Sequence, residues 1–158
     1  MLFSFSAETW SATITSWGRD NYNQVTSTPT NTGFTAIAGG VYHSLALASD
    51  GSIISWGSDG ANQVTNTPAG TGFTAIAGGH SHSLALTSNG SIISWGSDAQ
   101  DQVSNTPSGT GFTAIAGDGY HSLALATAVP LPASAWMGIV LLGAIGTMSV
   151  ARRRLCAA

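Results

Sequence analysis

The chain has 158 residues, a formal net charge of −3 and only 7% charged side chains. All seven acidic residues lie in residues 1–151 beside one basic residue, Arg19, whereas the C-terminus carries Arg152, Arg153 and Arg154. A body with one basic residue cannot neutralise a run of phosphates, so this composition argues against nucleic-acid binding. The 43% of hydrophobic residues favour a packed core over a disordered chain.

The N-terminal residues 1–12 are predicted to be irregular. Met1–Glu8 has neither the basic start nor the long apolar core of a signal peptide, so we expect the authentic start to lie upstream. The first predicted element is Thr13–Gly18, which matches the last strand of the repeats described next.

Residues 13–127 contain a repeat with a period of 39 residues, which decides the fold before any single element is considered. The string TGFTAIAG begins at Thr32, Thr71 and Thr110. The tryptophan and histidine of each unit keep the same step: Trp17, Trp56 and Trp95, and His43, His82 and His121.

Each unit reads as β-structure. Phe73–Ala77 and His82–Leu86 have the alternation of half-buried strands, and Ser91–Gly96 is the returning strand. Asn89-Gly90 between the last two predicts a tight hairpin with positive φ at both residues, as does Asp50-Gly51 one unit earlier. Short strands at regular spacing favour an all-β fold of propeller blades.

The string AGGHSHSLALTSNGSIISWGSD resembles the regulator of chromosome condensation type repeat, with its Gly-x-x-His-Ser, Asp/Asn-Gly and Trp-Gly elements. Gln-Val follows each Trp-Gly, and the family's Gly before that Gln is replaced here by Asn23, Asn62 and Asp101. The short period looks most like the bacterial secreted branch, which includes propeller-type β-lactamase inhibitors. The resemblance implies a β-propeller that serves as a binding surface.

The chain holds three such units, whereas a closed propeller has about 4 to 8 blades. The first unit begins with only a returning strand, Thr13–Gly18, and the last ends after His121–Ala126 without one. Three interpretations stay open: a fragment of a longer protein, an open wedge of three blades, and self-association, such as a dimer with six blades.

The C-terminal part divides into a motif at 128–133, an apolar run at 134–151 and an Arg-rich end at 152–158. The apolar run predicts a transmembrane helix, and the triple Arg that follows it predicts a cytoplasmic tail. Motif, span and Arg cluster together resemble the PEP-CTERM family of sorting signals in its VPLPA variant. That resemblance implies recognition by an exosortase, a membrane protease or transpeptidase, at Val129, Pro130, Leu131, Pro132 and Ala133.

The repeated histidines and tryptophans are interpreted as structural residues of the blades, because one copy occurs per unit. No metal site is expected from the three histidines, since equivalent positions on successive blades lie too far apart to share an ion. Asp20, Asp59 and Asp98 follow the Trp-Gly element and are interpreted as turn formers rather than calcium ligands.

No catalytic residue, cofactor or enzyme activity is predicted, because the sequence contains no known catalytic or phosphate-binding motif. Residues that differ between repeats at the strand ends are the candidate binding residues, since loops on a rigid scaffold carry recognition. These candidates are Tyr22, Tyr42, His80 and Tyr120.

The sequence thus predicts a non-enzymatic exported repeat protein. It would pass through the inner membrane as a precursor, reach the cell surface or extracellular space, and bind a protein or polysaccharide. The alternatives are a membrane-anchored structural or oligomerising module and an inhibitor of an exported enzyme.

Overall fold

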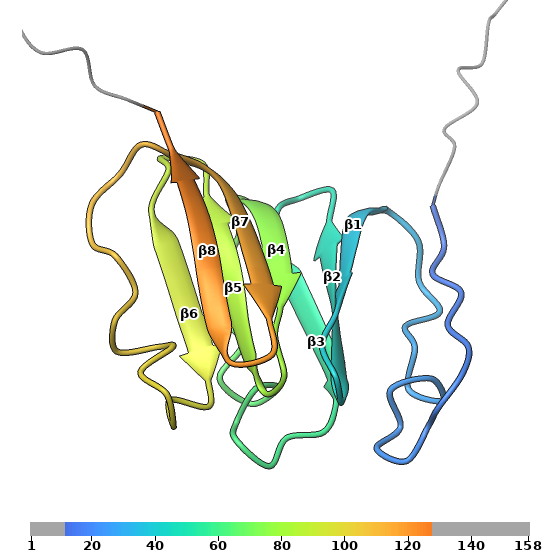
Figure 1. Cartoon of the computed structure of the whole chain (residues 1–158). Helices are drawn as coiled ribbons and strands as arrows, with labels where there is room; N and C mark the ends of the chain where they lie inside the picture. The colour runs from blue at the N-terminus through green and yellow to red at the C-terminus, as the bar shows by residue number, and fades with distance from the viewer. Residues whose placement is uncertain (1–11, 128–158) are drawn as a thin grey trace, which may run out of the picture. The chain divides into compact units, whose positions relative to one another are not determined.

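The computed structural model describes residues 12–127, and this part of the chain contains eight β-strands (Figure 1). Neighbouring strands pair antiparallel in three sheets: β1-β2-β3, β4-β5-β6 and β7-β8. The strands are β1 (Phe34–Gly39), β2 (His43–Ala48), β3 (Ile53–Gly57), β4 (Phe73–Gly78), β5 (His82–Thr87), β6 (Ile92–Gly96), β7 (Phe112–Asp118) and β8 (His121–Ala126).

The predicted all-β repeat is confirmed, and each strand falls within a residue or two of its expected bounds. The predicted turn chemistry is only half right. Gly51 and Gly90 have positive φ of 80° and 79°, but Asp50 and Asn89 do not. Each turn is a three-residue loop closed by its glycine, in which the N–H of Gly51 donates to the carbonyl of Ala48 at 2.9 Å.

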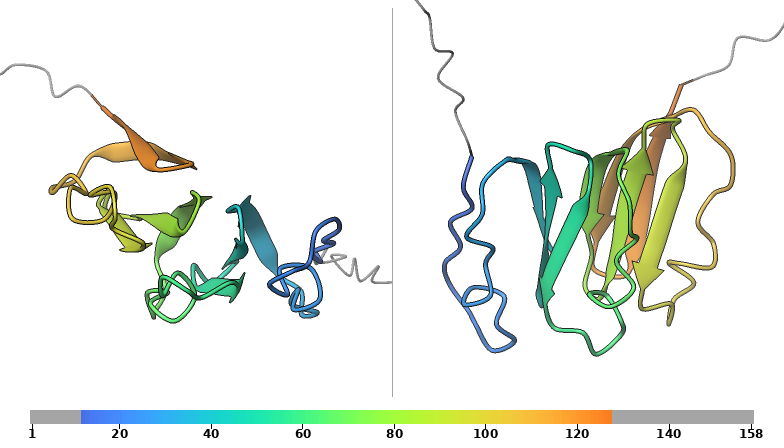
Figure 2. Two further views of the ribbon diagram at one scale, coloured as in Figure 1. Left: turned by 60° about the horizontal axis from the view of Figure 1, so that its bottom comes forward. Right: turned by 180° about the vertical axis from the view of Figure 1, so that it is seen from behind.

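The sheets stand side by side in chain order, like successive blades (Figure 2). β4 contacts both β1 and β7, so the first strands of successive sheets are neighbours. The core lies between the sheets: Leu45 and Leu47 pack with Phe73 and Ala85 of the next sheet. Each sheet is therefore stabilised mainly by burial against its neighbours.

The two ends of this array have no neighbouring sheet among residues 12–127. Leu123 is 61% exposed, whereas its counterpart Leu84 is 2% exposed. The expectation of a strand at Thr13–Gly18 is wrong, because the described residues from 12 up to Phe34 contain no strand. Trp17 likewise is not a core residue: it is 83% exposed, because no strand pairs beside it.

Within residues 12–127, no helix has the length and apolar character needed to cross a membrane. The predicted sorting motif at 128–133, the span at 134–151 and the Arg-rich end at 152–158 lie outside the described residues.

Candidate functional site

Two hydrogen bonds join neighbouring sheets beside the turns between the first and second strands, where the candidate residues Tyr42, His80 and Tyr120 lie. The Nε2 atom of His43 lies 2.8 Å from the hydroxyl of Ser83 in the next sheet. His82 repeats this contact with Ser122 at 2.9 Å. The repeated His-Ser dipeptide thus joins each sheet to the next one. The sequence pattern alone did not indicate this role for the serine.

Glycine makes room for these histidines. A Cβ atom on Gly40 would lie 2.3 Å from the His43 ring, and one on Gly79 would lie 2.1 Å from the His82 ring. Because real Cβ contacts are far longer than this, a larger residue at either position would displace the histidine. The second glycine of each AGG string, Gly40 and Gly79, therefore leaves the room that the histidine ring needs for the inter-sheet contact.

Burial also sets the protonation state of His43, which is 1% exposed. Desolvation, with a smaller contribution from His82, lowers the pKa of His43 from 6.5 to about 4. Its Nδ1 atom has no hydrogen-bond partner, so a proton added there would be buried without an acceptor. Desolvation also lowers the pKa of His82. These buried rings are neutral structural groups.

The long loops after β3 and β6 are built around one aspartate each. Asp59 accepts hydrogen bonds from the N–H groups of Val64 and Thr65, both at 2.9 Å, and from the Thr65 hydroxyl. The Thr65 hydroxyl and these N–H groups hold the pKa of Asp59 below its usual value. Asp20 and Asp98 make the equivalent bonds in their own loops. The carboxylates therefore close the loops in which they lie.

The same loops contain a left-handed residue at the position where the resembled family has glycine. Asn23, Asn62 and Asp101 have φ of 62°, 59° and 57°. Asn and Asp tolerate this region better than other residues with a Cβ, which explains why they replace glycine there.

Two buried tryptophans each fix a loop to the sheet that follows that loop. Trp56 Nε1 donates to the carbonyl of Gln24 at 2.9 Å, and Trp95 Nε1 donates to that of Gln63 at 2.9 Å. Trp56 and Trp95 are 7% and 5% exposed, as expected of structural residues. The loop thus presents its outer residues from a rigid base.

At this end of the sheets the four candidate binding residues form one continuous aromatic row. The ring of Tyr42 meets Tyr22 edge-on at 5.1 Å and His80 edge-on at 5.0 Å. His80 in turn stacks on Tyr120 at 5.0 Å. We call Tyr22, Tyr42, His80 and Tyr120 the aromatic row. The structure therefore brings together all four residues chosen from the sequence.

The row crosses all three sheets because its members lie in the turns that join the first two strands of each sheet, and in the loop before β1. Backbone hydrogen bonds connect the turns of neighbouring sheets. The N–H of Val41 donates to the carbonyl of Gly79 at 3.2 Å, and the N–H of His80 donates to the carbonyl of Gly119 at 2.8 Å. Tyr22 and Tyr120 remain 44% and 60% exposed.

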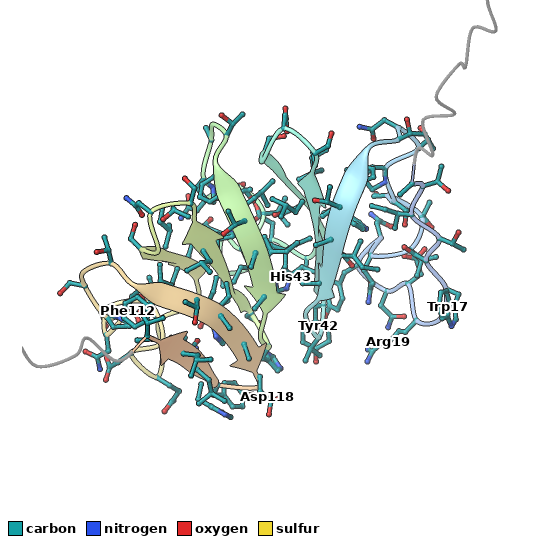
Figure 3. All side chains as sticks on the ribbon, turned by 90° about the horizontal axis from the view of Figure 1, so that it is seen from above. Trp17, Arg19, Tyr42, His43, Phe112 and Asp118 are labelled. Atoms are coloured by element: carbon teal, nitrogen blue, oxygen red, sulfur yellow. The ribbon has the colours of Figure 1, made fainter. Side chains whose placement is uncertain are left out.

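Arg19 extends the row with a positive charge, which the sequence interpretation did not include among the site residues. Its guanidinium lies 5.8 Å from the centre of the Tyr42 ring, within cation–π range. Figure 3 shows Arg19 and Tyr42 near one another, seen from above. The signal in the sequence was that Arg19 is the one basic residue of the repeat region and precedes Tyr22 closely.

This surface offers aromatic rings and one guanidinium as groups that could contact a ligand. Exposed aromatic faces with a nearby cation favour stacking and hydrogen bonding to a ligand. Within residues 12–127 no group of three or more His, Cys, Asp or Glu side chains is arranged to hold a metal ion. His121, the third repeated histidine, is exposed at the end of the array.

Comparison with known proteins agrees with this architecture. The family described as "Regulator of chromosome condensation (RCC1) repeat" matches residues 34–63 and 73–102. No curated protein matches the sequence.

Several solved structures have a similar fold. The ectodomain of the receptor kinase CR4 from Physcomitrella patens is 24% identical with a TM-score of 0.61, over 73% of this chain and 31% of that one. The CRINKLY WD40 ectodomain of the Arabidopsis thaliana receptor kinase ACR4 is also 24% identical, with a TM-score of 0.55 over 71% and 38%. Prp20p from Saccharomyces cerevisiae, whose binding to Gsp1p and histones has been described, is 20% identical with a TM-score of 0.55 over 72% and 39%.

At these identities the likeness concerns the fold, and this chain spans between 31% and 39% of the length of those proteins. Sequence and structure agree on the repeats themselves. Residues 34–63 and 73–102 match the RCC1 repeat, and the described sheets have a fold consistent with part of an RCC1-like β-propeller.

Proposed function

We propose that this chain is a non-enzymatic interaction module that binds a partner at the cell surface or in the extracellular space through the aromatic row. The observation that carries the proposal is the continuity of that row, in which three ring contacts of 5.0 to 5.1 Å connect the loop before β1 with the turns of all three sheets. Tyrosine supplies a large contact area at a low cost in side-chain entropy, which is why it is enriched at interfaces.

The partner that fits this surface is a protein or a polysaccharide. Tyrosine and histidine rings offer faces for a sugar or an aromatic side chain, and Arg19 offers hydrogen bonds to a carboxylate. Two of the structures with a similar fold are receptor-kinase ectodomains, which supports a role in recognition outside the cell.

Export is part of the same proposal and is supported by the sequence of the C-terminal part. Val129–Ala133 has the order of a VPLPA sorting motif, and the apolar run and Arg152–Arg154 follow it. An exosortase is the proposed partner for this segment. The chain would be held in the inner membrane as a precursor and then reach the surface.

The binding face is tested with a double variant, Tyr42→Ala with Tyr120→Ala. Binding is measured by capture from extracellular material of the producing cell and on a polysaccharide array. We expect the signal of whichever assay detects the partner, captured protein or bound glycan, to fall at least tenfold. A loss of this size is what the removal of one or two interface anchors produces. Ile93→Ala is the matched control, because Ile93 is exposed on β6 and lies outside the row. Unchanged capture by the double variant would refute the role of the row.

Sorting is tested separately by cell fractionation of the wild type and a Pro130→Ala, Pro132→Ala variant. A shorter form at the surface that disappears in the variant supports processing. Full-length protein confined to the inner membrane in both cases would instead favour a permanent anchor.

A further inference from the structure

The two ends of the array are complementary halves of one sheet. β8 pairs only with β7 among the described residues, whereas β2 and β5 each pair with a strand on both sides. The segment Thr13–Gly18, with the sequence TITSWG, resembles the third strands, which read SIISWG. One end therefore lacks a third strand, and the other has a segment with the sequence of a third strand that pairs with no sheet.

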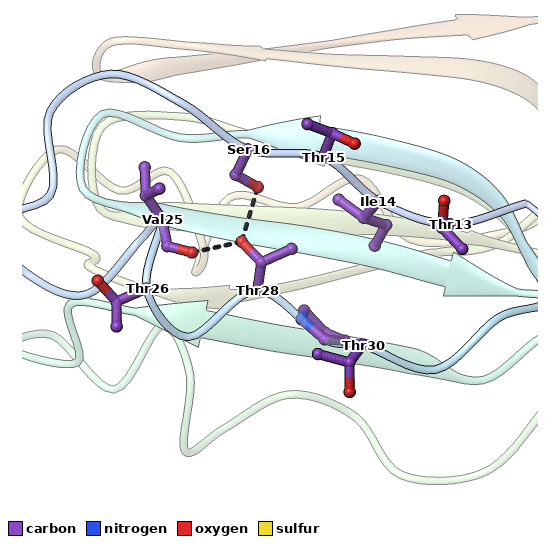
Figure 4. Close-up of a pocket in the computed structure, with 9 residues that line it drawn as sticks. Thr13, Ile14, Thr15, Ser16, Val25, Thr26, Thr28 and Thr30 are labelled. Carbon is purple, nitrogen blue, oxygen red and sulfur yellow. Dashed lines mark hydrogen bonds between the residues drawn. The ribbon is translucent and has the colours of Figure 1, made fainter.

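The segment Thr13–Gly18 already occupies the place of a third strand relative to the loop that follows it. The Thr28 hydroxyl donates to Ser16 Oγ at 2.7 Å (Figure 4), as the Thr67 hydroxyl does to Ser55 Oγ at 2.7 Å beside β3. Ile14 packs on the cluster that contains Phe34. The segment is thus positioned for pairing before any partner strand arrives.

A cavity lies where the missing tryptophan of the third sheet belongs. In the second sheet Trp95 lies opposite Ser83 and donates to the carbonyl of Gln63. One repeat later the equivalents are Ser122 and Gln102, and both line a cavity of about 250 Å³. The cavity is therefore lined by the counterparts of both residues next to Trp95, but it contains no tryptophan ring.

The exposed apolar side chains at the ends are those that the internal contacts bury. Leu123 and Leu125 are 61% and 64% exposed, and together with Ala114–Ala116 they line an apolar hollow. At the other end Ile37 is 65% exposed, whereas its counterpart Ile76 packs on the first inter-sheet core. Joining the ends would repeat the core already present between the first and second sheets.

We propose that two copies of this chain join head to tail, with Thr13–Gly18 of one copy pairing antiparallel with β8 of the other. The register of β2 with β3 and of β5 with β6 places Trp17 opposite Ser122 and Thr15 opposite Ala124. Trp17 Nε1 then donates to the carbonyl of Gln102. This interface lies beyond the ligand-binding role proposed above and does not depend on it.

The number of copies follows from closure. Residues 13–127 supply three units, so two copies of this region give six blades, which lies within the range of about 4 to 8 that closed propellers adopt. One copy or three copies fall outside that range. Both junctions of the two-copy ring are equivalent, and at each junction β8 gains the third strand that its sheet lacks among the described residues.

The first test is the oligomeric state of the full chain in a mild detergent, measured by sedimentation velocity over micromolar concentrations. We expect a dimer, and we expect Leu123→Asp to weaken dimerisation at least about 100-fold, because it buries an unpaired charge. Leu123 is exposed in the single copy, so the variant should keep its β-sheet circular dichroism spectrum. Ile93→Asp, an exposed change on β6, should remain dimeric. A monomeric wild type, or a dimer that persists in Leu123→Asp, would overturn the proposal.

The second test reads the register. A Thr15→Cys variant is mixed with an Ala124→Cys variant, both with the native thiol removed by Cys156→Ser, and the mixture is oxidised. We expect a disulfide-linked dimer that forms only in the mixture. Leu123→Cys mixed with Thr15→Cys is the control, because successive side chains of a strand point to opposite faces. Equal cross-linking in both mixtures would exclude this pairing.

Discussion

Lowering the pH from 7 to 4.5 is expected to destabilise the repeat region through His43. The pKa of this buried ring is about 4 in the folded chain, against an ordinary value of 6.5. Between pH 6.5 and pH 4 the ring is protonated in the unfolded chain but mostly neutral in the folded chain. The free energy of unfolding therefore falls as the pH falls. Above pH 6.5 the ring is mostly neutral in both states, so this loss of stability is absent there. The expected loss in the free energy of unfolding is about 1 kcal/mol at pH 5.5 and about 2–3 kcal/mol at pH 4.5.

The aspartates act in a different pH range, which keeps the effect of His43 visible. Hydrogen bonds lower the pKa of Asp20, Asp59 and Asp98 below 3.8, so their contribution is present above that pH and is lost below it. His82 acts in the same direction as His43, since burial lowers its pKa too. A loss of stability between pH 6.5 and 4.5 therefore reports the buried histidines.

The assay is urea unfolding followed by tryptophan fluorescence at pH 7.0, 5.5 and 4.5. His43→Gln removes the titrating group and is expected to flatten much of the pH dependence, whereas His121→Gln, at the exposed third histidine, should keep it. If His43→Gln unfolds too readily, an NMR titration of the His43 ring in the wild type gives its pKa directly. A free energy of unfolding that stays constant from pH 7.0 to 4.5, or a ring that titrates near 6.5, would refute the reasoning.

Three further substitutions test the packing and the loops. Gly79→Ala would place a Cβ atom 2.1 Å from the His82 ring and should cost about 1–3 kcal/mol in urea unfolding, whereas Gly60→Ala, with open space around it, should not. Asn62 has φ of 59°, so Asn62→Ala should cost about 1 kcal/mol and Asn62→Gly should be nearly neutral; equal losses would contradict the conformational explanation. Asp59→Ala removes the acceptor of the loop N–H groups and should lower the Tm at pH 7, and the difference from the wild type should shrink as the pH falls below 3.8. A constant difference would show that the carboxylate does not close the loop.

Much of the fold could be predicted because the sequence of each strand and turn recurs with the same period of 39 residues. The alternation in the TGFTAIAG string and in His82–Leu86 is local, and so are the glycines of the hairpins. The positive φ expected at Asp50 and Asn89 was wrong because the loop has three residues, which places only its glycine in the left-handed region.

The aromatic row could be predicted in membership but not in geometry. Its four residues were chosen because they differ between repeats at the strand ends, which is a feature of the sequence. Their ring contacts depend on the distance between neighbouring sheets, and the bond between His80 and Gly119 joins residues far apart in the chain. Trp17 shows the opposite case, because its sequence matches Trp56 but its environment does not.

The His-Ser contacts between sheets all run one way: the histidine belongs to the earlier sheet and the serine to the later one. The array therefore has a polarity, with a histidine face at one end and a serine face at the other. Two identical faces cannot form this contact with each other. An additional repeat can consequently be accepted at either end in one orientation, which makes gene duplication in units of 39 residues a route by which such an array can lengthen without redesign of its contacts.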